Sequence, residues 1–148
     1  HGIEAGDAPA VDLEAERKAG ALVRKLHGAR LIRAAHDLSD GGLMVSLCEV
    51  ALASQNRTIG ALCEREEQVT PEWLFAEGPS RVIVTVSPAV MDDFEQAAES
   101  AGIPIDWIGT TGGKGVGFRS VFSVSHEEMA DAYDHGLERA LGIHPVSD

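Results

Sequence analysis

Apolar residues recur every three or four positions in several stretches of the chain, which is the spacing of an amphipathic helix. Four helices are expected on this pattern, over residues 11–28, 43–54, 88–101 and 125–141. The first and third end at Gly28 and Gly102, since glycine commonly ends helices. The fourth starts with Ser125 and Glu128, which have the spacing of a capping box. Residues 43–54 are apolar on almost every side, so this helix is expected to be buried.

Shorter runs rich in apolar and β-branched residues predict four or five strands, at 31–35, 57–63, 82–86 and 103–108, with a last strand through Phe122. The run 31–35 suits a buried strand, whereas Pro104 places the run 103–108 at a sheet edge. Thr70-Pro71 can start a further short helix that ends at Phe75. The interleaving predicts a layered mixed α/β (α+β) domain, with a mixed sheet of about 4–5 strands and about four helices.

The length of 148 residues suits one domain, expected over residues 11–148. Residues 1–10 are small and polar, which indicates a linker or a cut end. The net charge of −12 disfavours binding to nucleic acid or to an anionic membrane surface. Neither a membrane-spanning run nor a signal peptide is evident, so a cytoplasmic protein is expected. The two cysteines, Cys48 and Cys63, are expected to be reduced packing residues.

The segment HDLSDGG, residues 36–42, holds the densest group of reactive side chains, between an expected strand and an expected helix. Gly41 and Gly42 allow backbone N–H groups to face an anion at the helix start, and Ser39 adds a hydroxyl, so this geometry suits phosphate. Asp37 and Asp40 would repel a phosphate unless a cation such as Mg²⁺ lay between them. The segment therefore predicts a site for nucleotide and magnesium.

A simpler interpretation is that this segment is only a capped turn, with Asp40 as the helix N-cap and His36 as a core histidine. Two other loops carry charged or glycine-rich sequences. Glu77 and Arg81 are expected to form a loop ion pair, although Glu77 could instead approach the ligand and Arg81 could hold a phosphate. The run GTTGGKGVG, residues 109–117, lacks the spacing of a phosphate-binding loop and is expected to be a hairpin connection.

The string HDLSDGGLMVSLCEVALA resembles the C-terminal AIR-synthase-related domain in the second half of phosphoribosylformylglycinamidine synthases. Three further strings agree with this family: PAVDLEAE, LFAEGPSRVIVTV and IGTTGG. The likeness runs in order from Pro9 to Gly142. Departures occur at SQNRTIG, residues 54–60, and at Ala76, where the family often has glycine.

The resemblance implies an ATP-dependent ligase of purine biosynthesis that amidates formylglycinamide ribonucleotide with Mg²⁺, ATP and ammonia from a glutaminase subunit. It implies that Asp37 contacts magnesium and that Ser39 contacts nucleotide. Asp40, Gly41 and Gly42 are added to the phosphate site from the anion geometry alone. An upstream ATP-binding domain is the implied partner, so the chain alone is expected to be inactive and to self-associate through the surface this partner would cover. The alternative is a non-catalytic structural or dimerisation domain of an AIR-synthase-related protein.

Overall fold

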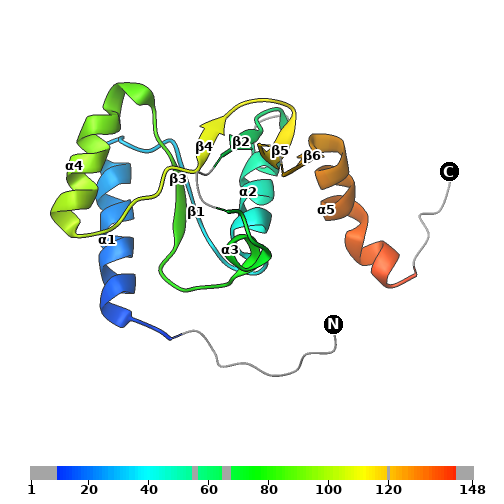
Figure 1. The fold of residues 1–148 in the computed structure, drawn as a ribbon, viewed down its shortest axis with the longest axis horizontal. Helices are drawn as coiled ribbons and strands as arrows, with labels where there is room; N and C mark the ends of the chain where they lie inside the picture. The colour runs from blue at the N-terminus through cyan, green and yellow to red at the C-terminus, as the bar shows by residue number, and fades with distance from the viewer. Residues whose placement is uncertain (1–9, 55–56, 65–67, 120, 143–148) are drawn as a thin grey trace. The chain divides into compact units, whose positions relative to one another are not determined.

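The computed structural model describes residues 10–54, 57–64, 68–119 and 121–142 (Figure 1). They divide into two compact units. Unit 1 comprises the described residues within 1–46 and 70–106, and unit 2 those within 47–69 and 107–148. The expected single domain over residues 11–148 stays a prediction. No helix in the described part of the chain is long and apolar enough to cross a bilayer.

Unit 1 contains a two-stranded antiparallel sheet and most of the helices. Its elements are α1 (Leu13–Gly28), β1 (Ala34–Asp37), the start of α2 (Gly42–Leu52), α3 (Pro71–Phe75), β3 (Val82–Thr85), the 3₁₀ turn η2 (Pro88–Val90) and α4 (Met91–Ala101). Strand β1 pairs with β3 from Ala34 opposite Thr85 to Asp37 opposite Val82. The Asp12 carboxylate caps α1 by accepting from the amides of Glu14 and Ala15 at 2.9 and 3.0 Å.

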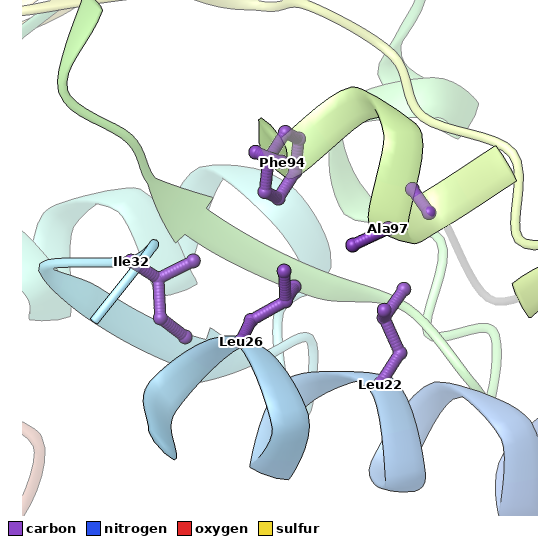
Figure 2. Close-up of a cluster of buried hydrophobic side chains, with 6 residues drawn as sticks. Leu22, Leu26, Ile32, Phe94 and Ala97 are labelled. Carbon is purple, nitrogen blue, oxygen red and sulfur yellow. The ribbon is translucent and has the colours of Figure 1, made fainter. Parts of the chain in front are cut away.

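The core of unit 1 lies where α1 packs against α4 (Figure 2). Leu22 and Leu26 of α1 meet Phe94 and Ala97 of α4, and Ile32 closes one end of the cluster. This is the apolar stripe that the helical spacing predicts for 11–28. Burial of this stripe removes apolar surface from water, which is the main favourable term in folding.

Unit 2 is built on a four-stranded mixed sheet. Its elements are the end of α2, then β2 (Ala61–Cys63), β4 (Gly109–Thr111), β5 (Gly115–Phe118), β6 (Phe122–Ser125) and α5 (His126–Ala140). The strand order is β4-β2-β5-β6, in which β2 is antiparallel to β4 and parallel to β5. The mixed sheet and the five α-helices of the described chain confirm the predicted mixed α/β class.

Several local signals are confirmed. Thr70 caps α3, Gly102 ends α4 in the left-handed conformation, and Ser125 and Glu128 form the capping box of α5. Helix α2 is largely buried as expected. Cys63 is buried, and this burial raises the pKa of its thiol to about 11, as befits a reduced packing residue.

Two strand predictions are wrong. The strand expected at 31–35 begins only at Ala34, because Ile32 enters the core and Arg30 turns the chain with φ 59°. It is also largely exposed rather than buried. Residues 103–108 form no strand, and the next strand, β4, begins at Gly109. Ile103 instead donates its amide to the Ala98 carbonyl at 3.1 Å, which closes the end of α4.

One turn prediction is also wrong. The run 109–117 is not a hairpin, because β4 and β5 lie on opposite sides of β2 and do not pair with each other. Its glycines turn the chain over the end of β2: Gly112 donates its amide to the Gly60 carbonyl at 2.8 Å. Helix α1 ends at Gly28 as predicted, and the residue with positive φ that follows it is Arg30.

The core of unit 1 predicts a large effect of truncating Leu26, which is 2% exposed. Leu26→Ala should lower the free energy of unfolding by about 2–5 kcal/mol, because lost burial and an unfilled cavity add together. Leu13→Ala is the matched control, since Leu13 lies in the same helix and is 77% exposed. Urea unfolding followed by circular dichroism measures both. Equal losses for the two variants would contradict this description of the core.

Candidate functional site

The segment 36–42 spans the end of β1 and the beginning of α2, as the sequence predicts. A β-turn joins them, in which the Gly42 amide donates to the Ser39 carbonyl at 3.0 Å. Gly41 and Gly42 both adopt positive φ, at 79° and 63°, a region that residues with a Cβ rarely enter. Glycine at both positions is therefore a requirement of this turn.

The Asp37 carboxylate is exposed and is held by its neighbour Ser39, whose hydroxyl donates to Asp37 Oδ2 at 2.5 Å. This hydrogen bond, followed by the Asp37 backbone amide, lowers the pKa of the Asp37 carboxyl. The backbone carbonyl of the same residue accepts from Ser46 Oγ at 3.2 Å and from His36 Nδ1 at 2.6 Å. The structure thus brings together an anionic carboxylate and a hydroxyl, the two groups that the resemblance assigns to metal and nucleotide.

A second loop meets this turn. The Gly41 amide donates to Glu77 Oε1 at 2.8 Å, across 36 residues of sequence. The same loop is tied to β1 because Leu38 donates its amide to the Arg81 carbonyl at 3.0 Å. The expected ion pair between Glu77 and Arg81 is absent among the described residues. Instead, Arg81 Nη1 donates to the Ala76 carbonyl at 3.2 Å.

The end of α3 lies against Gly42 more closely than any side chain would allow. A Cβ at Gly42 would lie 2.8 Å from the Phe75 carbonyl carbon and 2.9 Å from the Ala76 carbonyl oxygen. A Cβ at Gly41 would likewise collide with the side chain of Val45. The strings HDLSDGG and LFAEGPSR therefore form one composite site, although they are separate in sequence.

The Gly41 and Gly42 amides, which the sequence predicts to bind phosphate, both have hydrogen-bond partners in this conformation. The Gly41 amide binds Glu77 and the Gly42 amide binds the Ser39 carbonyl. A phosphate contact at Gly41 would require Glu77 to move. Asp40 is exposed, and no described residue donates a hydrogen bond to its carboxylate, so it does not cap α2 with its side chain.

The side chains of this loop fit magnesium only as part of a ligand set that includes phosphate and water. Within the described ranges, no three His, Cys, Asp or Glu side chains gather closely enough to hold a metal ion. Mg²⁺ does not require such a cage, because it keeps several waters and binds through one or two carboxylates together with phosphate oxygens. The exposed, ionised Asp37 fits this mode. Asp37 would then hold the ion jointly with a nucleotide phosphate.

Glu77 was expected to pair with Arg81 or to approach the ligand, and neither expectation gives the Gly41 amide as its partner. Its neighbours in sequence suggest only a loop, and its partner lies 36 residues away. The one signal that marks it is the likeness of LFAEGPSR to the same family as HDLSDGG. That likeness assigns the string to the family but does not indicate that Glu77 contacts the glycine turn.

The described residues form two units of mixed α/β structure, and unit 1 carries a glycine turn at a helix start. Residues 1–121 match the family model described as "AIR synthase related protein, C-terminal domain". Because this match covers most of the chain, the chain belongs to that family. Helix α5 lies beyond the matched residues.

Curated relatives give the same result. The chain is 40% identical over 142 residues to the phosphoribosylformylglycinamidine synthase subunit PurL of Moorella thermoacetica, covering 93% of this chain and 19% of that protein. It is 45% identical over 112 residues to the same subunit of Rhodospirillum rubrum, covering 76% of this chain and 15% of that protein. The chain thus spans about a fifth or less of the length of these relatives.

Solved structures agree on the fold. Thermotoga maritima PurL complexed with FGAR matches with a TM-score of 0.71 and 20% identity, over 87% of this chain and 23% of that one. The same protein complexed with ATP matches with a TM-score of 0.67 and 20% identity, over 81% and 22%. These likenesses confirm the AIR-synthase-type fold of the chain.

The close approach of α3 predicts that Gly42 tolerates no side chain. Gly42→Ala should lower the free energy of unfolding by more than about 1 kcal/mol, because its φ of 63° disfavours a Cβ and the Phe75–Ala76 backbone must shift. Gly136→Ala is the control, since Gly136 lies within α5 and a Cβ there meets nothing within 4 Å. That variant should be neutral or stabilising. Thermal unfolding of both distinguishes them, and a stable Gly42→Ala variant would refute the packing.

The hydrogen bond between Ser39 and Asp37 predicts a titration. Ser39→Ala should raise the pKa of Asp37 toward its ordinary value, because the hydroxyl is the largest cause of its lowering. In the parent, any stability from this bond is present above the unfolded-state pKa and is lost as pH falls through the lower folded-state pKa. Carboxyl ¹³C NMR measures the change. Ser39→Thr, which keeps a hydroxyl, should leave the pKa low, and a low pKa in the alanine variant would rule out this cause.

Proposed function

We propose that this chain is the C-terminal domain of a phosphoribosylformylglycinamidine synthase and that its 36–42 loop completes a pocket for a magnesium-bound nucleotide. The complete enzyme would amidate formylglycinamide ribonucleotide with ATP in purine biosynthesis. The observation that carries the proposal is the exposed Asp37 carboxylate, held by Ser39 at 2.5 Å, at the end of a strand and before the glycine turn. The relatives named PurL support the choice of reaction.

The roles of the residues follow from their chemistry. Asp37 would bind Mg²⁺ and Ser39 would contact the nucleotide, whose phosphates supply the remaining oxygen ligands. Magnesium would neutralise phosphate charge beside Asp37 and Asp40. Gly41 and Gly42 let the chain turn tightly at this point, and their amides contribute to phosphate binding only if their present partners are exchanged.

The remaining groups of the site would come from elsewhere. An upstream ATP-binding domain of the same enzyme would hold the adenine and triphosphate, and a glutaminase subunit would supply ammonia. The solved neighbours support this arrangement, since one is described as PurLQS from Thermotoga maritima. The 148-residue chain alone should therefore release no ADP from ATP. Such an enzyme would be cytoplasmic.

Charge removal at Asp37 tests the proposal in the complete synthase. Magnesium-bound ADP should raise the melting temperature of the parent, and Asp37→Asn should reduce this rise, because the metal loses an anionic ligand. A tenfold weaker affinity would remove about 1.4 kcal/mol of ligand-dependent stabilisation. Asp106→Asn is the control, since Asp106 is exposed in the irregular segment before β4.

The ligand-free melting temperature of Asp106→Asn should equal that of the parent, since the Asp106 side chain is exposed. Asp37→Asn loses the carboxylate that Ser39 holds, so the nucleotide-dependent rise of each variant is measured from its own ligand-free melting temperature. Equal nucleotide-dependent shifts in the parent and Asp37→Asn would end the proposal for this loop. That result would favour the alternative of a non-catalytic structural or dimerisation domain, in which segment 36–42 is only a turn.

A further inference from the structure

A basic segment without acids interrupts this acidic chain. Between residues 17 and 36 there is no Asp or Glu, although the chain has 24 of them. The same twenty positions hold six of the 12 basic residues: Arg17, Lys18, Arg24, Lys25, Arg30 and Arg33. The segment covers most of α1 and the loop that leads into β1. Its charge is opposite in sign to the net charge of −12.

Four of these cations are not neutralised within the described chain. Arg17 and Lys18 pair with Glu14 at 2.8 and 3.7 Å. No acidic side chain of the described residues lies within ion-pair distance of the other four, which are all exposed: Arg24, Lys25, Arg30 and Arg33. This differs from Arg57, Arg119 and Arg139, each of which pairs with an Asp or Glu. Within the described chain, the positive charge at this end of α1 therefore has no acidic partner.

Two of these cations, Arg24 and Arg33, line an apolar cleft of about 240 Å³ between α1 and the start of β1. Its apolar lining comes from Val23, Ile32, Ala34 and Ala35. Arg24, His27 and Arg33 also line it and carry the polar groups. No Asp or Glu of the described chain lines the cleft. Ala34 and Ala35, which do line it, are exposed in β1.

We propose that this cleft binds an acidic peptide segment of a partner protein, with one large apolar side chain in the cleft and carboxylates on Arg24 and Arg33. Arginine binds carboxylates through two parallel hydrogen bonds, which favours it for this contact. The apolar lining supplies affinity and the cations supply orientation and a faster encounter. This surface is distinct from the 36–42 loop and does not depend on the function proposed for it.

Size and charge exclude other occupants. Small-molecule sites usually enclose about 300–1,000 Å³, more than this cleft provides, whereas one side chain needs less. A nucleic acid would extend beyond the four cations onto the acidic remainder of a chain of net charge −12, which disfavours it, whereas a short peptide meets the basic segment alone. A second copy of this chain would bring its whole net charge of −12 to the contact, and sedimentation tests that occupant separately.

An array of short acidic peptides tests the proposal on the 148-residue chain. Each peptide has Asp and Glu around one central residue, which is varied through Leu, Ile, Met, Phe, Trp and Ala. Fluorescence anisotropy should detect binding that weakens with salt and is at least about tenfold weaker for a central Ala, since the cleft would then be empty. Matched peptides with Asn and Gln in place of the acids should not bind.

Protein variants separate a local site from general attraction. Arg24→Glu and Arg33→Glu should each weaken binding about tenfold or more. Lys114→Glu is the control, because it makes the same charge change on an exposed turn of unit 2. It should change affinity by less than about twofold. Circular dichroism checks that each variant is folded, and Arg24→Gln and Arg33→Gln replace any that is not.

Four results would overturn the proposal. The first is that Lys114→Glu weakens peptide binding as much as Arg24→Glu or Arg33→Glu does. The second is that the central-Ala peptide binds as tightly as peptides with a large central side chain, and the third is that no acidic peptide binds at low salt. The fourth is that sedimentation shows a dimer that Arg33→Glu dissociates. The last would assign the cleft to a second copy. None of these results bears on the nucleotide-dependent shift of Asp37→Asn, so the two proposals fail separately.

Discussion

The contact between the Phe75–Ala76 backbone and Gly42 is the constraint on which the site depends. No Cβ fits between them, so α3 can lie against the start of α2 only because position 42 is glycine. That approach brings Glu77 within 2.8 Å of the Gly41 amide and aligns Arg81 with Leu38. The loop is thus shaped by packing from outside it. The geometry of this exposed polar site is therefore set by the close contact between Gly42 and the Phe75–Ala76 backbone.

Helices were predictable here because their signals are local. A cap, a proline at the first turn or a glycine at the end acts within a few residues, as the capping box of α5 illustrates. The amphipathic spacing of α1 likewise predicts the face that meets α4. Strands were less predictable because pairing decides where they begin. Residues 103–108 have the composition of a strand, yet Ile103 is used to close α4.

The candidate site likewise has one part that the local sequence predicts and one part that tertiary packing decides. The position of Asp37, Ser39 and the two glycines between a strand and a helix follows from the order of residues in segment 36–42. The partner of the Gly41 amide does not, because it arrives through tertiary packing. The short separation of Glu77 and Arg81 in one loop favours an ion pair, with an approach of Glu77 to the ligand as the alternative. The packing of α3 against Gly42 instead places the carboxylate at the Gly41 amide, near the start of a helix.

The strand order of unit 2 has a consequence for folding during synthesis. Strand β2 pairs only with β4 and β5, which come from residues 109–118, whereas every segment of unit 1 precedes residue 107. Closing so long a loop costs conformational entropy before any interstrand hydrogen bond forms. A chain emerging from a ribosome can therefore complete unit 1 while β2 still has two unpaired edges. For that interval, the central strand of the later sheet is the segment most open to pairing with another chain.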